Sequence, residues 1–385
     1  MKRIVVLGSS GSIGTQVLDI VNRLPDRLKV VGLAAYSNAD VLARQAAEFS
    51  VPYVCIGSAH YGEEILGSLA RRNTQVLYGV EGMCALASLP EADLVVVAVA
   101  GAVGIKPTQA AIAAGKEIAL ASKEVLVAAG EPTMRLAREH GVAIRPIDSE
   151  HSALFQCLQG APDGSVERLY LTASGGPFRT TSAEALASVT PEEALKHPTW
   201  NMGGLVTINS ATLMNKGLEI IEAHWLFGIP ISAIEVVVHP QSIIHSMVRF
   251  RDGSLLAQLG LPDMRLPIQY ALLYPERLDA RLPRLDPVQM GALTFEAMDA
   301  RRFPAVELAR KAAGIGGTMP AVMNAANEEA VGLFLDRQIP FTGIMEVVER
   351  VMELHEPLEP TYENVLEADA WARQAARRTG RLGQG

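Results

Sequence analysis

Apolar residues follow two different rhythms along the first part of the chain. Short continuous apolar runs at 3–7, 28–35 and 94–100 have the length and the β-branched content of buried strands. The segment 15–24, between the first two runs, instead has apolar residues at helical spacing. Alternation of apolar strands with helices is typical of a parallel sheet that is covered on both faces. The pattern therefore predicts an α/β fold that begins with a Rossmann-like domain over residues 1–146.

The pattern changes after this domain. Loops rich in serine, threonine and glycine separate open-faced strands at 235–238 and 246–250, which we interpret as an antiparallel pair. This predicts a central α+β domain over residues 147–273. A linker rich in proline follows over 274–299, and from 300 to 385 the apolar spacing is helical. The last part is predicted to be a C-terminal helical bundle.

Composition narrows the choice of partners. The chain has 34 Lys and Arg against 42 Asp and Glu, a formal net charge of -8, and 5% aromatic residues. Neither a nucleic acid nor a membrane surface is therefore an expected partner. The apolar stretch 94–105 is too short to span a bilayer, and we expect no secretory leader. Three cysteines without a CxxC pair fit a reducing compartment, so we expect a cytoplasmic protein.

A glycine-rich turn, GSSGSIG at 8–14, joins the first strand to the first helix. Glycines allow the backbone to approach a pyrophosphate, which the helix N-terminus stabilises. The second strand ends at Tyr36-Ser37-Asn38, without the acidic residue that usually binds the ribose of NAD. Ser37 and Asn38 therefore favour NADP. The alternatives are a turn that binds no nucleotide and a purely helix-capping role for Ser37.

Three carboxylates are candidate metal ligands. Asp148 and Glu150 follow a strand, and in an extended segment residues two apart point the same way. Glu219 lies on a helix, where it shares a face with Asn215 and Lys216. Hard oxygen ligands indicate Mg²⁺ or Mn²⁺. The alternatives are surface carboxylates without a metal and an ordinary intrahelical ion pair.

Several polar loops are candidates for substrate contacts. Ser174 opens a glycine-rich turn that is able to hold an anion, and Ser210 and Lys216 are candidate phosphate ligands. His197 and Trp200 lie in a loop suited to closing over a substrate, although a lone histidine is more often a surface or capping residue. Lys123 follows a strand of the first domain and either contacts a substrate oxygen or stays solvated.

Taken together, these segments resemble the 1-deoxy-D-xylulose 5-phosphate reductoisomerase family. The matching segments are GSSGSIG (8–14), ALASKE (119–124), IDSEHSALFQCL (147–158), SGGPFR (174–179), HPTWNMG (197–203), NSATLMNKGLE (209–219), HPQSIIHSMV (239–248) and NAANEEA (324–330). The resemblance implies a V-shaped homodimer with three domains: a nucleotide-binding domain, a central α+β catalytic domain over 147–273 that also binds the metal, and a C-terminal helical bundle. It also implies that 1-deoxy-D-xylulose 5-phosphate is rearranged and then reduced by NADPH to 2-C-methyl-D-erythritol 4-phosphate, an early step of the non-mevalonate isoprenoid route.

The resemblance also implies roles for individual residues. One divalent metal, Mg²⁺, Mn²⁺ or Co²⁺, is held by Asp148, Glu150 and Glu219. The catalytic set is Lys123, Asp148, Glu150, Glu219 and His197. Substrate contacts are implied for Lys123, Ser149, Glu150, Ser174, His197, Trp200, Ser210, Asn215, Lys216 and Glu219. NADPH contacts are implied for Ser10, Gly11, Ser12, Ile13, Ser37, Asn38, Ser122, Glu124 and Gly203.

The chain departs from the family pattern at a few positions. Tyr36 stands where glycine is usual, Ser122 where asparagine is usual, and Asn209 where aspartate is usual. Two other classes of function are alternatives: a metal-independent NADP oxidoreductase of the semialdehyde or homoserine dehydrogenase type, and a nucleotide-binding sensor without turnover. Three converging carboxylates argue against both, because they reduce stability unless they bind something.

Overall fold

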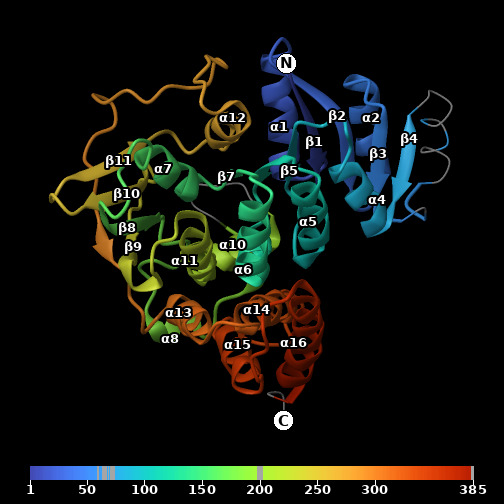
Figure 1. Cartoon of the computed structure of the whole chain (residues 1–385). Coiled ribbons are helices and arrows are strands. Elements are labelled where there is room, and N and C mark those ends of the chain that lie inside the picture. The colour runs from blue at the N-terminus through green and yellow to red at the C-terminus, as the bar shows by residue number, and fades with distance from the viewer. Residues whose placement is uncertain (59, 63–66, 68, 70–73, 197–202, 383–385) are drawn as a thin grey trace. The chain divides into compact units, whose positions relative to one another are not determined.

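The chain forms two compact units in the computed structural model (Figure 1). The structure describes residues 1–58, 60–62, 67, 69, 74–196 and 203–382. The first unit comprises Met1–Val125, Thr133–Ser152 and Asp263–Pro283. The second unit comprises Leu126–Pro132, Ala153–Pro262 and Arg284–Gly385. The predicted domain boundaries remain predictions.

A parallel sheet of seven strands forms the core of the first unit, in the order β4-β3-β2-β1-β5-β6-β7. The strands are β1 (Lys2–Leu7), β2 (Leu28–Ala35), β3 (Tyr53–Ile56), β4 (Gln75–Tyr78), β5 (Leu94–Val97), β6 (Glu117–Leu120) and β7 (Ile144–Pro146). The helices are α1 (Ser12–Arg23), α2 (Ala39–Glu48), α4 (Gly79–Ala87), α5 (Ile105–Ala113) and α12 (Arg265–Leu273). The predicted Rossmann-like fold is confirmed.

The strand order reverses at β1, which pairs with β2 on one side and with β5 on the other. Ligands of such sheets bind beyond the carboxyl ends of the strands at this reversal point. The glycine-rich turn at 8–14 follows β1 directly. The fold therefore places this turn where a nucleotide is expected.

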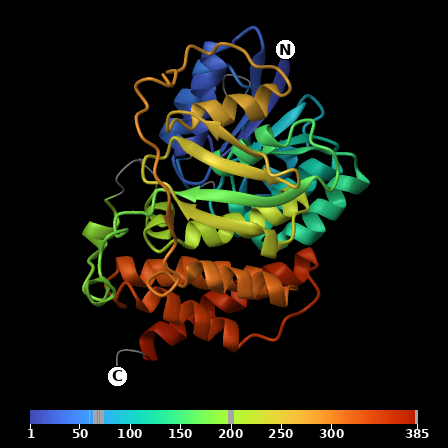
Figure 2. The same cartoon turned by 90° about the vertical axis from the view of Figure 1, so that its left-hand side faces the viewer.

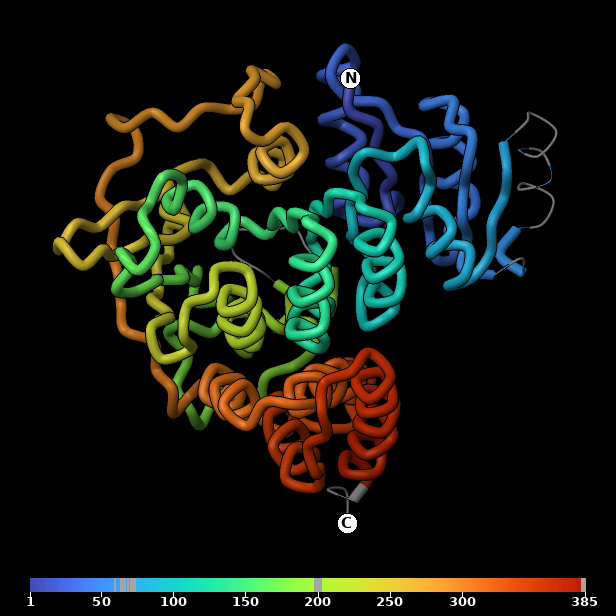
Figure 3. The backbone as a smooth tube through the Cα atoms, viewed as in Figure 1, coloured from blue at the N-terminus to red at the C-terminus, as the bar shows by residue number. Residues whose placement is uncertain are grey.

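Helix α12 packs beside α1 although it is more than 240 residues away in the sequence (Figure 3). Arg265 on α12 pairs with Asp263 at 2.6 Å and reaches Asp19 on α1 at 3.2 Å. The hydrogen bond from Arg265 holds the pKa of Asp263 below its usual range. These charged contacts, with buried Ile268 and Leu272, attach α12 to the first unit.

The second unit contains a mixed sheet of five strands, in the order β11-β10-β8-β9-β12 (Figure 2). The strands are β8 (Val166–Ala173), β9 (Ile234–Val238), β10 (Ile244–Phe250), β11 (Leu255–Leu259) and β12 (Glu296–Ala297). Strands β9 and β10 run in opposite directions, as predicted for 235–238 and 246–250, but they do not pair with each other. Strand β8 lies between them, parallel to β9 and antiparallel to β10. The turn between β9 and β10 carries the chain across β8, so consecutive strands are not neighbours.

The second unit also contains several helices. They are α8 (Ala183–Leu186), α9 (Pro191–Ala194), α10 (Gly204–Ala211), α11 (Met214–Phe227), α13 (Ala305–Ile315), α14 (Met319–Leu335), α15 (Gly343–Glu353) and α16 (Tyr362–Leu382). Helices α13 to α16 confirm the predicted C-terminal helical region. Within the described part of the chain, no helix combines the length and the hydropathy needed to cross a bilayer.

Helices α6 (Lys123–Glu139) and α7 (Ser149–Cys157) each contribute residues to both units. The middle of α6 has non-helical backbone angles at Ala129 and contains Pro132. Proline removes a helical hydrogen bond and bends the axis. Both helices start in the first unit, directly after strands β6 and β7 respectively, and both contain residues of the second.

Gly217 allows α11 and α13 to approach each other closely. A Cβ at this position would lie 2.8 Å from Ala309 Cβ and 3.1 Å from Ala305 O. Alanine is the better helix former by about 1 kcal/mol, but overpacking costs about 1–3 kcal/mol. Neither neighbouring atom ends a flexible side chain, so we expect Gly217→Ala to lower the thermal midpoint. Gly332→Ala on α14, where no atom lies within 4 Å, should raise it. Equal midpoints for the two variants in a thermal melt would contradict this packing argument.

Candidate functional site

The glycine-rich turn after β1 has no room for side chains at its start. Gly8 has a φ of +91°, and a Cβ there would lie 2.3 Å from the carbonyl oxygen of Ala98 after β5. Gly11 precedes the first turn of α1 and is exposed, as is Ser12. The first N–H groups of a helix have no partner within the helix and are available to an anion. The turn therefore fits the pyrophosphate of a dinucleotide.

The tip of β2 combines a helix cap with exposed polar groups. Asn38 Oδ1 accepts a hydrogen bond from the backbone N–H of Val41 at 3.1 Å and thus caps α2. The capping role considered for Ser37 therefore falls on Asn38. Tyr36, Ser37 and Asn38 are all exposed.

Two further predicted NADPH contacts lie near the carboxyl end of β5. Ser122 is buried, and its hydroxyl donates to the carbonyl of Val99 at 2.5 Å. Glu124 Oε1 accepts from the N–H of Gly101 at 3.3 Å. Both side chains therefore fix the loop that follows β5, on the same edge of the sheet as the glycine-rich turn.

Asp148 caps α7, so the expectation of an extended segment through Glu150 is wrong. Its Oδ1 accepts from the N–H groups of Glu150 at 3.1 Å and His151 at 3.3 Å. Aspartate is a favoured N-cap because its carboxylate satisfies the first N–H groups of a helix. Glu150 lies in the first turn of α7 and accepts from the Ser149 hydroxyl at 2.6 Å.

Two further groups bind the Asp148 carboxylate. Lys123, at the start of α6, forms an ion pair with Oδ2. His151 Nδ1 lies 2.7 Å from Oδ1, and the imidazole is fully buried. His151 is not among the predicted site residues, although its position three after Asp148 in a capped helix was an available signal. It orients the carboxylate that Lys123 also holds.

A second carboxylate is buried in the other unit. Glu219 on α11 is fully buried and accepts from Asn215 Nδ2 and, at 2.5 Å, from Lys216 Nζ. The three side chains share one face of the helix, as their spacing predicts. A buried carboxylate needs such donors, because an unpaired buried charge is strongly destabilising.

Two polar turns lie directly against each other near the start of α11. Gly176 has a φ of +66°, and a Cβ there would lie 2.9 Å from the carbonyl oxygen of Ser210. Ser174 Oγ accepts from the N–H of Gly176 at 3.3 Å. Leu213, which precedes α11, is left-handed with a φ of +60°. The structure thus brings the backbone of the Ser174 turn against the end of α10 at Ser210.

The remaining predicted residues and the cysteines add less to the site. Gly203 precedes α10, whereas His197 and Trp200 lie outside the described residues.

Burial raises the pKa of the Cys157 thiol to about 11 and that of Cys55 to about 12. Both thiols therefore stay protonated near neutral pH and are poor nucleophiles.

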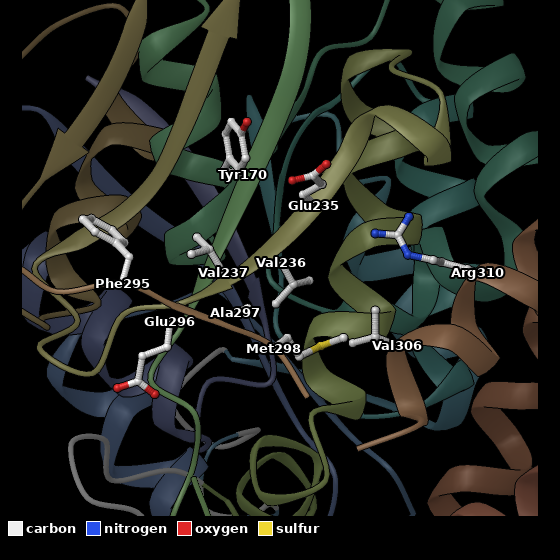
Figure 4. A pocket seen from close by; sticks show the side chains of 10 residues that line it. All are labelled: Tyr170, Glu235, Val236, Val237, Phe295, Glu296, Ala297, Met298, Val306 and Arg310. Atoms are coloured by element: carbon white, nitrogen blue, oxygen red, sulfur yellow. The ribbon is translucent and has the colours of Figure 1, made fainter. Parts of the chain in front are cut away.

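A separate hollow of about 490 Å³ opens beside β9 and β12 in the second unit (Figure 4). None of the predicted site residues lines it. Its charged groups have structural partners, since Glu235 pairs with Arg168 and Arg310 donates to the carbonyls of Ile231 and Ile234. This hollow is therefore not the candidate site.

A doubly wound sheet with a glycine-rich turn, joined to a unit with a buried carboxylate and polar turns, defines the class of dinucleotide-dependent α/β oxidoreductases. Family models place the chain within this class. Residues 4–130 match the model for 1-deoxy-D-xylulose 5-phosphate reductoisomerase, and residues 144–227 and 259–375 match two C-terminal domain models of the same enzyme. The chain belongs to the 1-deoxy-D-xylulose 5-phosphate reductoisomerase family.

Individual relatives are similar to this chain over nearly its whole length. The reductoisomerase of Pelotomaculum thermopropionicum is 56% identical over 97% of both chains. That of Heliobacterium modesticaldum is 55% identical over 100% of this chain and 98% of the relative. The Zymomonas mobilis enzyme in complex with NADPH has a TM-score of 0.92 at 43% identity, covering 98% of this chain and 99% of that one. A reductoisomerase in complex with NADPH, fosmidomycin and magnesium has a TM-score of 0.94 at 38% identity, covering 100% and 99%.

Gly176→Ala tests the contact between the Ser174 turn and Ser210. Because the new Cβ must displace the Ser210 carbonyl, we expect KM for the phosphorylated substrate of this family to rise roughly tenfold. Gly164→Ala is the matched control, since Gly164 is also left-handed, with a φ of +72°, but has no atom within 4 Å. Both variants should lose about 1 kcal/mol of stability from the left-handed backbone. An equal KM for both variants in steady-state assays would show that this contact does not shape the site.

Proposed function

We propose that this chain converts 1-deoxy-D-xylulose 5-phosphate into 2-C-methyl-D-erythritol 4-phosphate. The carbon skeleton is rearranged and the resulting aldehyde is reduced, in a reaction that requires NADPH and a divalent metal. The observation that carries this proposal is the full-length match to a reductoisomerase bound to NADPH, fosmidomycin and magnesium. The reaction is an early step of isoprenoid precursor biosynthesis.

The donor chemistry of three carboxylates fits a hard divalent cation. We assign Asp148, Glu150 and Glu219 as its ligands. Carboxylate oxygens without cysteine or paired histidine favour Mg²⁺, which solved relatives contain, and also suit Mn²⁺ and Co²⁺. When bound, the ion supplies Lewis-acid polarisation of the substrate's carbonyl and hydroxyl oxygens. His151 keeps Asp148 oriented, and Lys123 offers its ammonium group to a substrate hydroxyl.

The first unit fits NADPH, which supplies the hydride for the reduction. The glycine-rich turn receives the pyrophosphate, while Ser37 and Asn38 face the 2′-phosphate. The contacts assigned in this unit are Ser10, Gly11, Ser12, Ile13, Ser37, Asn38, Ser122 and Glu124, and Gly203 of the second unit is assigned as a further contact. Neutral polar side chains at the tip of β2 support NADP over NAD, because a carboxylate there would repel a phosphate.

The phosphate of the substrate is assigned to the end of α10 and the start of α11. Ser174 and Ser210 offer hydroxyls, and Asn215 and Lys216 offer an amide and an ammonium group. Lys216 supplies the positive charge that a phosphate needs. Ser149 is assigned to a substrate hydroxyl, and His197 and Trp200 to a loop that closes over the substrate. We also propose that the protein is cytoplasmic and forms a homodimer.

Metal-stripped protein tests the function directly. We expect no oxidation of NADPH in the presence of 1-deoxy-D-xylulose 5-phosphate until Mg²⁺ or Mn²⁺ is added, because the polarising cation is then missing. NADH should be a much poorer donor. The measurement is the loss of absorbance of the reduced nicotinamide. Oxidation that is insensitive to the metal would move the metal-independent dehydrogenase class to the front, and NADPH binding without turnover would favour the sensor.

Glu219→Gln tests the assigned metal ligand. Loss of one carboxylate should reduce kcat at least about 100-fold, because the polarising ion contributes several kcal/mol. NADPH affinity, measured by fluorescence titration, should stay within about twofold of the parent. Glu328→Gln is the matched control, because Glu328 is also a largely buried helical carboxylate and pairs with Arg373 at 2.7 Å. If both variants lose activity equally, or if Glu219→Gln loses NADPH binding, the assignment of Glu219 is wrong.

A further inference from the structure

One segment that the sequence singles out, NAANEEA at 324–330, has no part in the proposed site. It lies on α14, where Asn324 and Asn327 are three residues apart and therefore lie on the same side of the helix. Both are buried, with 1% and 0% of their surface exposed. A buried amide is costly unless it forms hydrogen bonds. The partners of these amides therefore indicate what each one stabilises.

The two amides have different partners. Asn324 Nδ2 donates to Glu328 Oε1 at 2.9 Å, one turn further along α14. Glu328 in turn accepts from Arg373 on α16, so this chain of contacts stays within the helical bundle. Asn327 Nδ2 donates to Oδ1 of Asn209 on α10, also at 2.9 Å. Only the second amide reaches the segment that leads to the assigned phosphate site.

Asn209 lies in the last turn of α10, directly before Ser210. The Thr212 hydroxyl shares its proton between the carbonyls of Ile208 at 3.1 Å and Asn209 at 3.3 Å, and it accepts from the N–H of Met214 at 3.3 Å. Leu213 between them is the left-handed residue from which α11 starts. A side chain that holds Asn209 therefore holds the whole turn that presents Ser210 and starts α11.

The hydrogen bond between Asn327 and Asn209 specifies how α10 lies against α14, because the side chains around it are apolar. Ile208, Ala211, Ala325, Ala326 and Val331 of the same two helices are buried in the apolar core. Apolar contacts are non-directional and allow helices to slide, whereas a hydrogen bond between buried amides specifies one register.

We propose that Asn327 is a positioning residue for the substrate phosphate. Through Asn209 it fixes the end of α10 against α14, and thereby the place of the Ser210 hydroxyl and the start of α11. This inference rests on the proposed phosphate role of Ser210 and Lys216. The helical bundle thus contributes to substrate affinity without touching the substrate.

A pair of alanine variants tests the proposal. Asn327→Ala and Asn324→Ala each remove one buried amide of α14, so both should lower the thermal midpoint. Only Asn327→Ala should raise KM for 1-deoxy-D-xylulose 5-phosphate, by about tenfold, the order expected when one buried hydrogen bond is lost. KM for NADPH should change less than about twofold in both variants. Equal changes in substrate KM for the two variants would overturn the positioning role.

An aspartate series gives an independent test that does not create a cavity. Asn327→Asp or Asn209→Asp leaves one amide facing one carboxylate, because the remaining amide can turn its NH₂ group toward it. Each single variant should keep substrate KM within about threefold of the parent. The double variant places two carboxylates together without a donor and should raise KM about tenfold or more. A double variant that behaves like the two singles would refute the link, even if Asn327→Ala fails to fold.

Ser210→Ala separates this inference from the assignment on which it rests. If Ser210→Ala leaves substrate KM unchanged, the phosphate assignment is wrong. If it raises KM while Asn327→Ala does not, the phosphate assignment stands and the positioning role of Asn327 is wrong.

Discussion

The second unit contains a wholly buried carboxylate, Glu219, and the residues around it must stabilise its charge. Such a group is stable only where donors or a cation surround it. Asn215 and Lys216 provide the donors from the same helix face. Their geometry depends on where α11 starts, and this start is fixed by left-handed Leu213 and by the close packing of Gly217 on α13. The chemistry of the site thus depends on the backbone at one helix start.

Two charged residues of the first unit, Lys123 and Asp148, also lie at helix starts. Lys123 begins α6, and Asp148 caps α7 and pairs with Lys123. Both helices also contain residues of the second unit, although α6 returns to the first unit after Pro132. Carboxyl ends of parallel strands are where ligands bind, and β6 and β7 end directly before these two helices. In the first unit, too, charged side chains are held by the backbone at helix starts.

Strands β1, β2 and β5 of the first sheet could be predicted because buried parallel strands are continuous apolar runs, whereas β3 and β4 were not among the predicted strands. The order of β9, β8 and β10 could not be predicted, since apolar patterning does not tell on which side of β8 a strand pairs. The prediction of an extended segment from Asp148 to Glu150 was wrong for a local reason. An aspartate that follows a strand has the same sequence neighbours whether it extends the strand or caps a helix. The contact of Asn327 with Asn209 joins residues 118 positions apart, and no local pattern indicates such a partner.

The tip of β2 shows how one residue can satisfy the fold and the proposed cofactor together. Asn38 must cap α2, and its Oδ1 does so. Aspartate would cap equally well, because both residues offer a side-chain oxygen. The difference lies in the remaining group, since asparagine keeps an NH₂ donor whereas aspartate keeps negative charge. A 2′-phosphate is attracted by the first and repelled by the second. The capping requirement therefore limits this position to a few residue types, and between aspartate and asparagine the proposed contact with a 2′-phosphate favours asparagine.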